Sequence, residues 1–134
     1  TDTLVENPIV SAWVRKSLEQ LKVTAQKQKM PIEPHLLHPV FKETFWVCLI
    51  GKGYPAPRQG FRWCTDRMKI QPVNQFIREM VRVNGETIVV LGTRKAESAT
   101  RAATMLKHEA GRVRDRLSPN ARLPNSLIYS PIED

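Results

Sequence analysis

The spacing of apolar residues predicts a long helix near the start of the chain. Asn7 and Pro8 form a helix start, because an Asn side chain can cap free backbone N–H groups and proline is tolerated in the first turn. Apolar side chains then recur every three or four residues, at Val10, Trp13, Val14, Leu18, Leu21 and Ala25. We therefore predict an amphipathic helix of about five turns, preceded by a strand end in residues 1–6.

Further along the chain, the pattern alternates between helix and strand. Residues 32–37 fit a short strand between prolines, and residues 41–50 are strongly apolar and predict a second helix. Glycines and prolines in the next seven residues end that helix, and the loop they open runs to about Arg62. Pro72 then opens a third predicted helix, with an apolar face that extends to Met80.

The last third of the chain contains the clearest strand. Residues 87–91 are a β-branched run that is typical of a central strand buried on both faces of a parallel sheet. Gly92 ends it, a fourth helix with many alanines starts near Lys95, and residues 126–129 fit a last short strand. This order predicts an α/β fold. The strands are few and short, so we expect neighbouring strands to lie outside this chain.

Composition narrows the class of protein. The 134 residues suit one domain, and a hydrophobic share of 41% excludes a disordered chain. No apolar run approaches the roughly 18 residues of a membrane span, so we expect no membrane partner. The net charge of +8 favours an anionic partner such as nucleic acid or a nucleotide. Two cysteines make no disulfide framework, and a reduced, cytoplasmic setting is the simpler interpretation.

Residues 51–69 mix cations with aromatic side chains, among them Tyr54, Phe61 and Trp63. Such a mixture suits a ligand that carries phosphates and a base to stack on. The alternative is a solvated basic loop with a few anchoring aromatics. The candidate nucleic-acid-binding residues are the cations of this stretch and of a later basic segment: Lys52, Arg58, Arg62, Arg67, Lys69, Arg112, Arg114 and Arg116.

Cys64 stands among these cations, which lower the pKa of a thiol and favour a thiolate nucleophile or metal ligand. The alternative is a buried, inert cysteine, which we favour for Cys48 in its apolar surroundings. One cysteine cannot hold a metal alone, so any cluster at Cys64 would need ligands from elsewhere.

The turn after residues 87–91 is the second candidate site. Ligands of open α/β sheets bind beyond the carboxyl ends of strands, with phosphates near helix N-termini. Gly92 allows close approach, Thr93 can donate to a phosphate, and Arg94 can grip one with two parallel hydrogen bonds. Glu97 could orient a cation or a sugar hydroxyl, or could simply favour the helix dipole, and Ser98 lies in the same first turn.

Asp2 and Thr3 would face the same edge if the strands are parallel, and a frayed terminus is the alternative. The chain contains neither of the common glycine-rich phosphate loops, G-x-x-x-x-G-K-[ST] and G-x-G-x-x-G.

Four segments resemble a known family: TDTLVENP, TFWVCLIGKGYPAPRQGFRWCTDRMKIQP, VLGTRKAESATRA and LPNSLIYSPIED. The chain is similar to the phosphoadenosine phosphosulfate (PAPS) reductase-like family of adenine-nucleotide α-hydrolases, and within it to the ATP-pyrophosphatase subunits of bacterial DNA phosphorothioation. Gly92, Arg94, Glu97 and Ser98 resemble the family's G-x-R-x-x-[EQ]-S signature. Asp2 and Thr3 resemble its acid–Thr pair at a strand end. Cys64 resembles the cysteine region that related reductases use around an iron–sulfur cluster.

The resemblance implies a partial Rossmann-like parallel sheet and cleavage of ATP, bound with Mg, between the α and β phosphates. It implies DNA, a cysteine desulfurase and other phosphorothioation proteins as partners, and a possible [4Fe-4S] cluster. Arg94, Glu97 and Ser98 would be catalytic, and Asp2, Thr3, Gly92 and Thr93 would join Arg94 in binding the nucleotide. The family's S-G-G-x-D-S pyrophosphate loop is missing, so residues 1–134 are expected to form a single incomplete domain that is inactive alone.

Two other functions stay open. One is a sulfonucleotide reductase of the same family. The other is a non-catalytic DNA-binding module, which the basic segment around Arg112, Arg114 and Arg116 supports.

Overall fold

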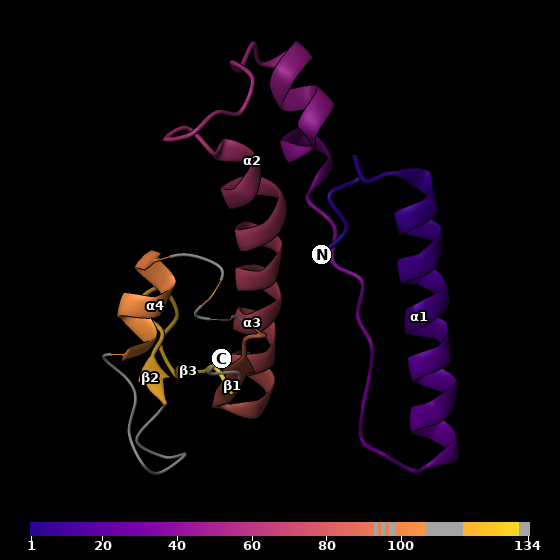
Figure 1. Cartoon of the computed structure of the whole chain (residues 1–134). Coiled ribbons are helices and arrows are strands. Elements are labelled where there is room, and N and C mark those ends of the chain that lie inside the picture. The colour runs from indigo at the N-terminus through magenta and orange to yellow at the C-terminus, as the bar shows by residue number, and fades with distance from the viewer. Residues whose placement is uncertain (93, 95, 97–98, 107–116, 132–134) are drawn as a thin grey trace. The chain divides into compact units, whose positions relative to one another are not determined.

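The computed structural model describes residues 1–92, 94, 96, 99–106 and 117–131. The described chain mixes helices with a small three-stranded sheet, which confirms the mixed α/β character, but the sheet has one parallel and one antiparallel pair and is not the wholly parallel sheet predicted (Figure 1). It forms two compact units, Thr1–Asn74 and Gln75–Asp134, and each is considered by itself. Within the described residues, no helix combines the length and the apolar character needed to cross a bilayer.

Helix α1 spans Pro8–Lys27 and confirms the first predicted helix. The Asn7 side chain accepts a hydrogen bond from the amide of Ile9 at 2.9 Å, and proline occupies the first position. The predicted apolar stripe is only partly covered: Ala25 is buried, whereas Trp13 is largely exposed. The local signals were therefore sufficient to place the helix, but not to say how much of its apolar face is buried.

The strands predicted for residues 1–6 and 32–37 are wrong. Both segments are irregular, and one backbone hydrogen bond, from the Asp2 amide to the Leu37 carbonyl at 2.8 Å, links them. Proline cannot donate to a ladder, and three prolines lie within residues 31–39. Leu4 also has a φ of 63°, in the left-handed region, which turns the chain out of an extended path.

The predicted helix over residues 41–50 exists, but it is not a regular α-helix. A 3₁₀ turn, η1 (Phe41–Glu43), is followed by a wider π-helical segment, η2 (Val47–Gly51). Cys48 is fully buried in this segment, as predicted. Gly53, with a φ of 66°, follows it, and the Tyr54 amide closes back onto the Cys48 carbonyl at 3.0 Å. This turn directs the chain into the loop that precedes Trp63.

Pro72 does not open the third helix but lies inside a longer helical run. The run comprises α2 (Trp63–Thr65), the π segment η3 (Asp66–Ile70) and α3 (Gln71–Asn84). A proline inside an α-helix lacks one N–H donor, and its ring clashes with the carbonyl four residues earlier. The wider turn of η3 directly before Pro72 relieves this clash, which explains how the run continues through the proline.

The sheet is built from β1 (Thr87–Val90), β2 (Ser118–Pro119) and β3 (Ser126–Tyr129), in the order β1-β3-β2. β1 pairs with β3 in parallel, from Thr87 opposite Ser126 to Val90 opposite Tyr129, and β2 pairs with β3 antiparallel. The strands predicted for residues 87–91 and 126–129 are thus confirmed, and the short β2 is additional. Parallel pairing needs a crossover, and α4 (Ala99–Leu106) lies between β1 and β3 in the sequence.

The prediction that β1 is a central strand buried on both faces is wrong. Within the described residues β1 is an edge strand with β3 as its one neighbour. Its side chains alternate between half-buried and exposed, and Ile88 and Val90 are 54% and 60% exposed. Residue type alone could not distinguish these cases, because β-branched residues favour both edge and central strands.

Leu123 provides a test of the core in the second unit, because it is only 2% exposed. We expect Leu123→Ala to lower the free energy of unfolding by about 2–4 kcal/mol, since apolar contacts are lost and a cavity remains. The control Leu106→Ala removes an exposed leucine from α4 and should change it by about 0.5 kcal/mol or less. Urea unfolding measures both, and equal losses would contradict this assignment of the core.

Candidate functional site

The carboxyl ends of β1 and β3 lie at one edge of the sheet, because the two strands are parallel. The Leu91 amide continues the pairing beyond β1 by donating to the Tyr129 carbonyl at 2.8 Å. Gly92 follows directly, and Arg94 is exposed just beyond it. Both residues thus follow the carboxyl end of β1, the end of a strand at which ligands of open α/β sheets bind, and their contact with a ligand stays a prediction.

Packing within the described chain does not require a glycine at position 92. A Cβ atom built there would meet no other described atom within 4 Å. The open space leaves room for a ligand to approach the backbone closely, which a side chain would hinder. Thr93, Glu97 and Ser98, the other predicted members of this site, lie outside the described residues.

Asp2 and Thr3 are buried, but they do not end a strand. The Asp2 carboxylate accepts a hydrogen bond from the Leu4 amide at 2.9 Å, and its other oxygen lies 4.0 Å from Nδ1 of His38. The Thr3 hydroxyl donates to the Glu6 carboxylate at 2.8 Å. These polar groups therefore stabilise a local turn in the first unit. Gly92 and Arg94 belong to the second unit, so a shared site remains a prediction.

The basic and aromatic stretch of the first unit is organised around one acid, Glu43. One carboxylate oxygen lies 2.8 Å from the Lys52 ammonium, and the other accepts a hydrogen bond from the Arg67 guanidinium. Arg67 also donates to the Tyr54 hydroxyl at 2.9 Å. We call Glu43, Lys52, Tyr54 and Arg67 the Glu43 clasp. The clasp joins η1, the loop of residues 52–62 and η3, which are separate in the sequence.

The charges of the clasp depend on one another. The hydrogen bond from Lys52, supported by Arg67, holds the pKa of the Glu43 carboxyl below its usual range, although partial burial opposes this effect. The same carboxylate raises the pKa of Arg67. Two of the five cations predicted to contact nucleic acid in this stretch are therefore engaged internally, and Glu43 neutralises one of their two charges.

The aromatic residues of this stretch have different environments. Trp63 is buried and stacks on Phe45, with ring centroids 5.5 Å apart and planes inclined at 23°. The Tyr54 ring packs edge-on against the Trp63 ring, with centroids 5.5 Å apart. The Trp63 indole N–H donates to the Pro55 carbonyl at 2.9 Å. Trp63 and Tyr54 thus anchor the loop, which is the alternative role considered for them from the sequence.

Phe61 instead lies at the base of a tight turn. Arg58 and Phe61 exchange two backbone hydrogen bonds, of 3.3 and 2.9 Å, and Gly60 between them has a φ of 85°. Phe61 is 42% exposed, and the side chains of Arg58 and Arg62 are exposed as well. Lys69 is exposed on η3, whereas Arg112, Arg114 and Arg116 lie outside the described residues.

Cys64 is a free, half-buried thiol in α2. Cys48 is buried, with its sulfur 3.9 Å from the Glu43 carboxylate and 4.0 Å from the Lys42 carbonyl. No three His, Cys, Asp or Glu side chains of the described chain gather as a metal site. These residues therefore do not form a complete set of ligands for an iron–sulfur cluster.

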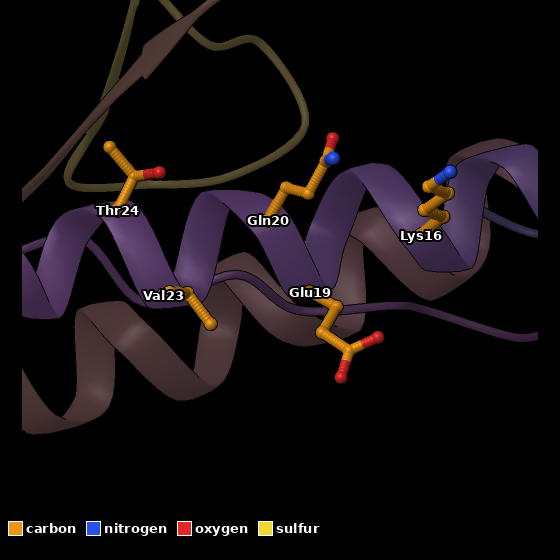
Figure 2. Close-up of a pocket in the computed structure, with 5 residues that line it drawn as sticks. All are labelled: Lys16, Glu19, Gln20, Val23 and Thr24. Atoms are coloured by element: carbon orange, nitrogen blue, oxygen red, sulfur yellow. The ribbon is translucent and has the colours of Figure 1, made fainter.

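A hollow of about 510 Å³ lies along α1. Its lining residues repeat at helical spacing, and Figure 2 shows Lys16, Gln20 and Thr24 on one side of the helix and Glu19 and Val23 on the other. All five belong to one helix and none is an aromatic or a buried charge. We assign no chemistry to this hollow.

Sequence reasoning did not identify Glu43, although one signal was available. It is the only acid between Glu33 and Asp66, a span that contains two lysines and two arginines. A single acid among many cations is a natural partner for them. Its two partners could not be chosen from the sequence, because spacing alone does not bring residue 43 next to residue 67.

Comparisons with protein-family models, curated proteins and solved structures found no match for this chain.

Replacing Glu43 tests the clasp. We expect Glu43→Gln to lower the free energy of unfolding at pH 7 by about 1–3 kcal/mol, because two charge-assisted hydrogen bonds lose their ionised acceptor. The pKa of Glu43 is lowered by folding, so its contribution is complete above the unfolded pKa of about 4.3 and is lost as pH falls through the folded value. Urea unfolding between pH 7 and pH 3 measures this.

Glu19→Gln is the matched control, since Glu19 is an exposed acid on α1. Its effect on stability should be small throughout this pH range. A Glu43→Gln protein as stable as the wild type at pH 7, or a loss that persists unchanged at pH 3, would contradict the role of the clasp.

Proposed function

We propose that the carboxyl edge of β1 and β3 binds the phosphates of ATP. We further propose that the chain is part of an ATP pyrophosphatase of the PAPS reductase-like type, which serves bacterial DNA phosphorothioation. The observation that supports this best is the parallel pairing of β1 with β3, because the carboxyl end of β1 lies beside that of β3 and leads directly into Gly92 and Arg94. The choice of ATP as the nucleotide, and of cleavage between its α and β phosphates as the reaction, rests on the resemblance of this turn to the G-x-R-x-x-[EQ]-S signature.

In this proposal Gly92 lets a phosphate approach the backbone, where a larger side chain would interfere. The Arg94 guanidinium offers two parallel hydrogen bonds and a charge that suits phosphate oxygens. From the sequence, Thr93 would donate a further hydrogen bond, Glu97 would orient a cation or a sugar hydroxyl, and Ser98 would lie in the same first turn. Hydrolysis between the α and β phosphates then releases pyrophosphate and AMP.

The exposed side chains of β1 are consistent with a larger, Rossmann-like sheet. Ile88 and Val90 are β-branched and apolar, and their exposure leaves apolar surface that another strand or helix would cover. An iron–sulfur cluster at Cys64 stays a prediction, since its other ligands would have to come from outside the described residues.

A DNA-binding module without catalysis is the second candidate. The exposed side chains of Arg58, Arg62 and Lys69 favour it, since they lie outside the Glu43 clasp. In a salt titration, phosphate contacts give a steep fall in log affinity with log salt concentration. DNA binding accompanied by no measurable binding of ATP would favour this candidate over the first.

Arg94 provides the direct test of the nucleotide site. We expect Arg94→Ala to weaken binding of Mg-ATP about 10- to 100-fold, because a bidentate, charged partner of the phosphate is lost. Arg94→Lys should recover only part of the affinity, since lysine keeps the charge but not the fork geometry. Isothermal titration calorimetry with Mg-ATP measures each affinity.

Arg78→Ala is the matched control, because Arg78 is an exposed arginine on α3 in the same unit. It should bind Mg-ATP as the wild type does. Unchanged affinity in a folded Arg94→Ala protein would remove Arg94 from the site. Where ATP is turned over, pyrophosphate and AMP are the expected products, and ADP with phosphate would contradict the proposed reaction.

A further inference from the structure

We propose that the turn from Arg58 to Phe61, together with Arg62, contacts single-stranded DNA. In this contact Phe61 stacks on an unpaired base, and the two arginines bind the neighbouring phosphates. The inference deepens the proposed function by naming the form of the nucleic acid, and it rests on that function only for the choice of DNA. It does not involve the nucleotide edge at Gly92.

The backbone holds this turn in one conformation. The amide of each end residue donates to the carbonyl of the other, from Arg58 to Phe61 at 3.3 Å and from Phe61 to Arg58 at 2.9 Å. Gly60 supplies the left-handed φ of 85° that such a turn requires, which other residues adopt only with strain. A turn closed from both ends presents its side chains from fixed positions.

The segments on both sides of the turn are anchored. Pro55, before it, accepts the hydrogen bond of the Trp63 indole at 2.9 Å, and Trp63, after it, is buried against Phe45. The turn therefore lies between two anchored residues, Pro55 and Trp63, which this hydrogen bond joins. A loop with fixed ends loses less conformational entropy when it binds a ligand.

The charge of the turn is available to an anionic partner. Lys52 and Arg67 are engaged by Glu43, but among the described residues neither Arg58 nor Arg62 forms an ion pair. No acidic residue occurs in the sequence between Glu43 and Asp66. Two unneutralised guanidinium groups next to an exposed ring are complementary to a sugar–phosphate chain with an unpaired base.

The exposed phenyl ring favours a single strand over a duplex. A phenylalanine side chain has no hydrogen-bonding group, so it cannot read base edges in a groove by hydrogen bonds, but it can stack on the face of any unpaired base. In a duplex those faces are covered by neighbouring base pairs. A short turn with one ring and two cations therefore suits an unpaired segment, without selection for its sequence.

The test is fluorescence anisotropy of a labelled single-stranded oligodeoxynucleotide of about 16 nucleotides, with the full 134-residue chain and no added nucleotide. We expect Phe61→Leu to weaken binding about 5-fold or more, because a leucine side chain cannot stack on a base. Phe61→Trp should bind at least as tightly as the wild type. Arg58→Ala should reduce the slope of log affinity against log salt by about 0.7, the value for one phosphate contact on a single strand.

Matched controls separate the turn from general charge and exposed apolar surface. Phe41→Leu alters an aromatic residue that is 82% exposed elsewhere in the same unit, and it should leave binding unchanged. Circular dichroism confirms that each variant is folded. The proposal is overturned if Phe61→Leu binds like the wild type, if Phe41→Leu causes an equal loss, or if a duplex of the same length binds as tightly as the single strand.

The same measurement distinguishes this proposal from the nucleotide site. Arg94→Ala should bind the single strand as the wild type does, since Arg94 is not part of the turn. Unchanged Mg-ATP affinity in a folded Arg94→Ala protein, together with intact, Phe61-dependent DNA binding, would refute the nucleotide site alone. Mg-ATP binding that weakens in Arg94→Ala, together with DNA binding that stays unchanged in Phe61→Leu, would refute the turn alone.

Discussion

The carboxylate of Glu43 links three segments of the first unit, η1, the loop of residues 52–62 and η3. It lies between Lys52 and Arg67, and its side chain is only 15% exposed. A carboxylate removed this far from water needs partners for both oxygens, since an unpaired buried charge costs several kcal/mol. By accepting hydrogen bonds from both cations, Glu43 holds the loop of residues 52–62 and η3 close to η1. Tyr54, which accepts a hydrogen bond from Arg67, packs edge-on against the ring of Trp63.

Near the clasp, side chains of the same type have two different environments. Within ten residues, Trp63 and Arg67 face inward to anchor the loop, whereas Phe61 and Arg62 remain exposed. The two groups have the same chemistry, a ring and a guanidinium. What separates them is access to Glu43 and to the ring of Phe45. Phe61 and Arg62 are thus accessible to an external partner, whereas Trp63 and Arg67 hold the loop through internal contacts.

In the second unit, the corresponding constraint is the direction of the strands. Parallel pairing places the carboxyl ends of β1 and β3 at the same edge, so the turn at Gly92 and the residues after Tyr129 emerge together. An antiparallel pair would have placed these ends at opposite edges. The proposed phosphate contact of Arg94 follows from this direction, whichever residues complete the site.

Local signals in the sequence were enough for several elements. The Asn7–Pro8 start determined α1, and the β-branched run determined β1, because capping and steric preferences act within a few residues. The sequence also contained every cation and aromatic of the two candidate sites. Only the tertiary structure decided that residues 1–6 and 32–37 form no strands, that β1 lies at an edge, and that Glu43 engages Arg67 but not Arg62. The physical reason is the same in each case: a ladder, a buried face and an ion pair each need a partner that is distant in the chain, and its position depends on how the whole unit packs.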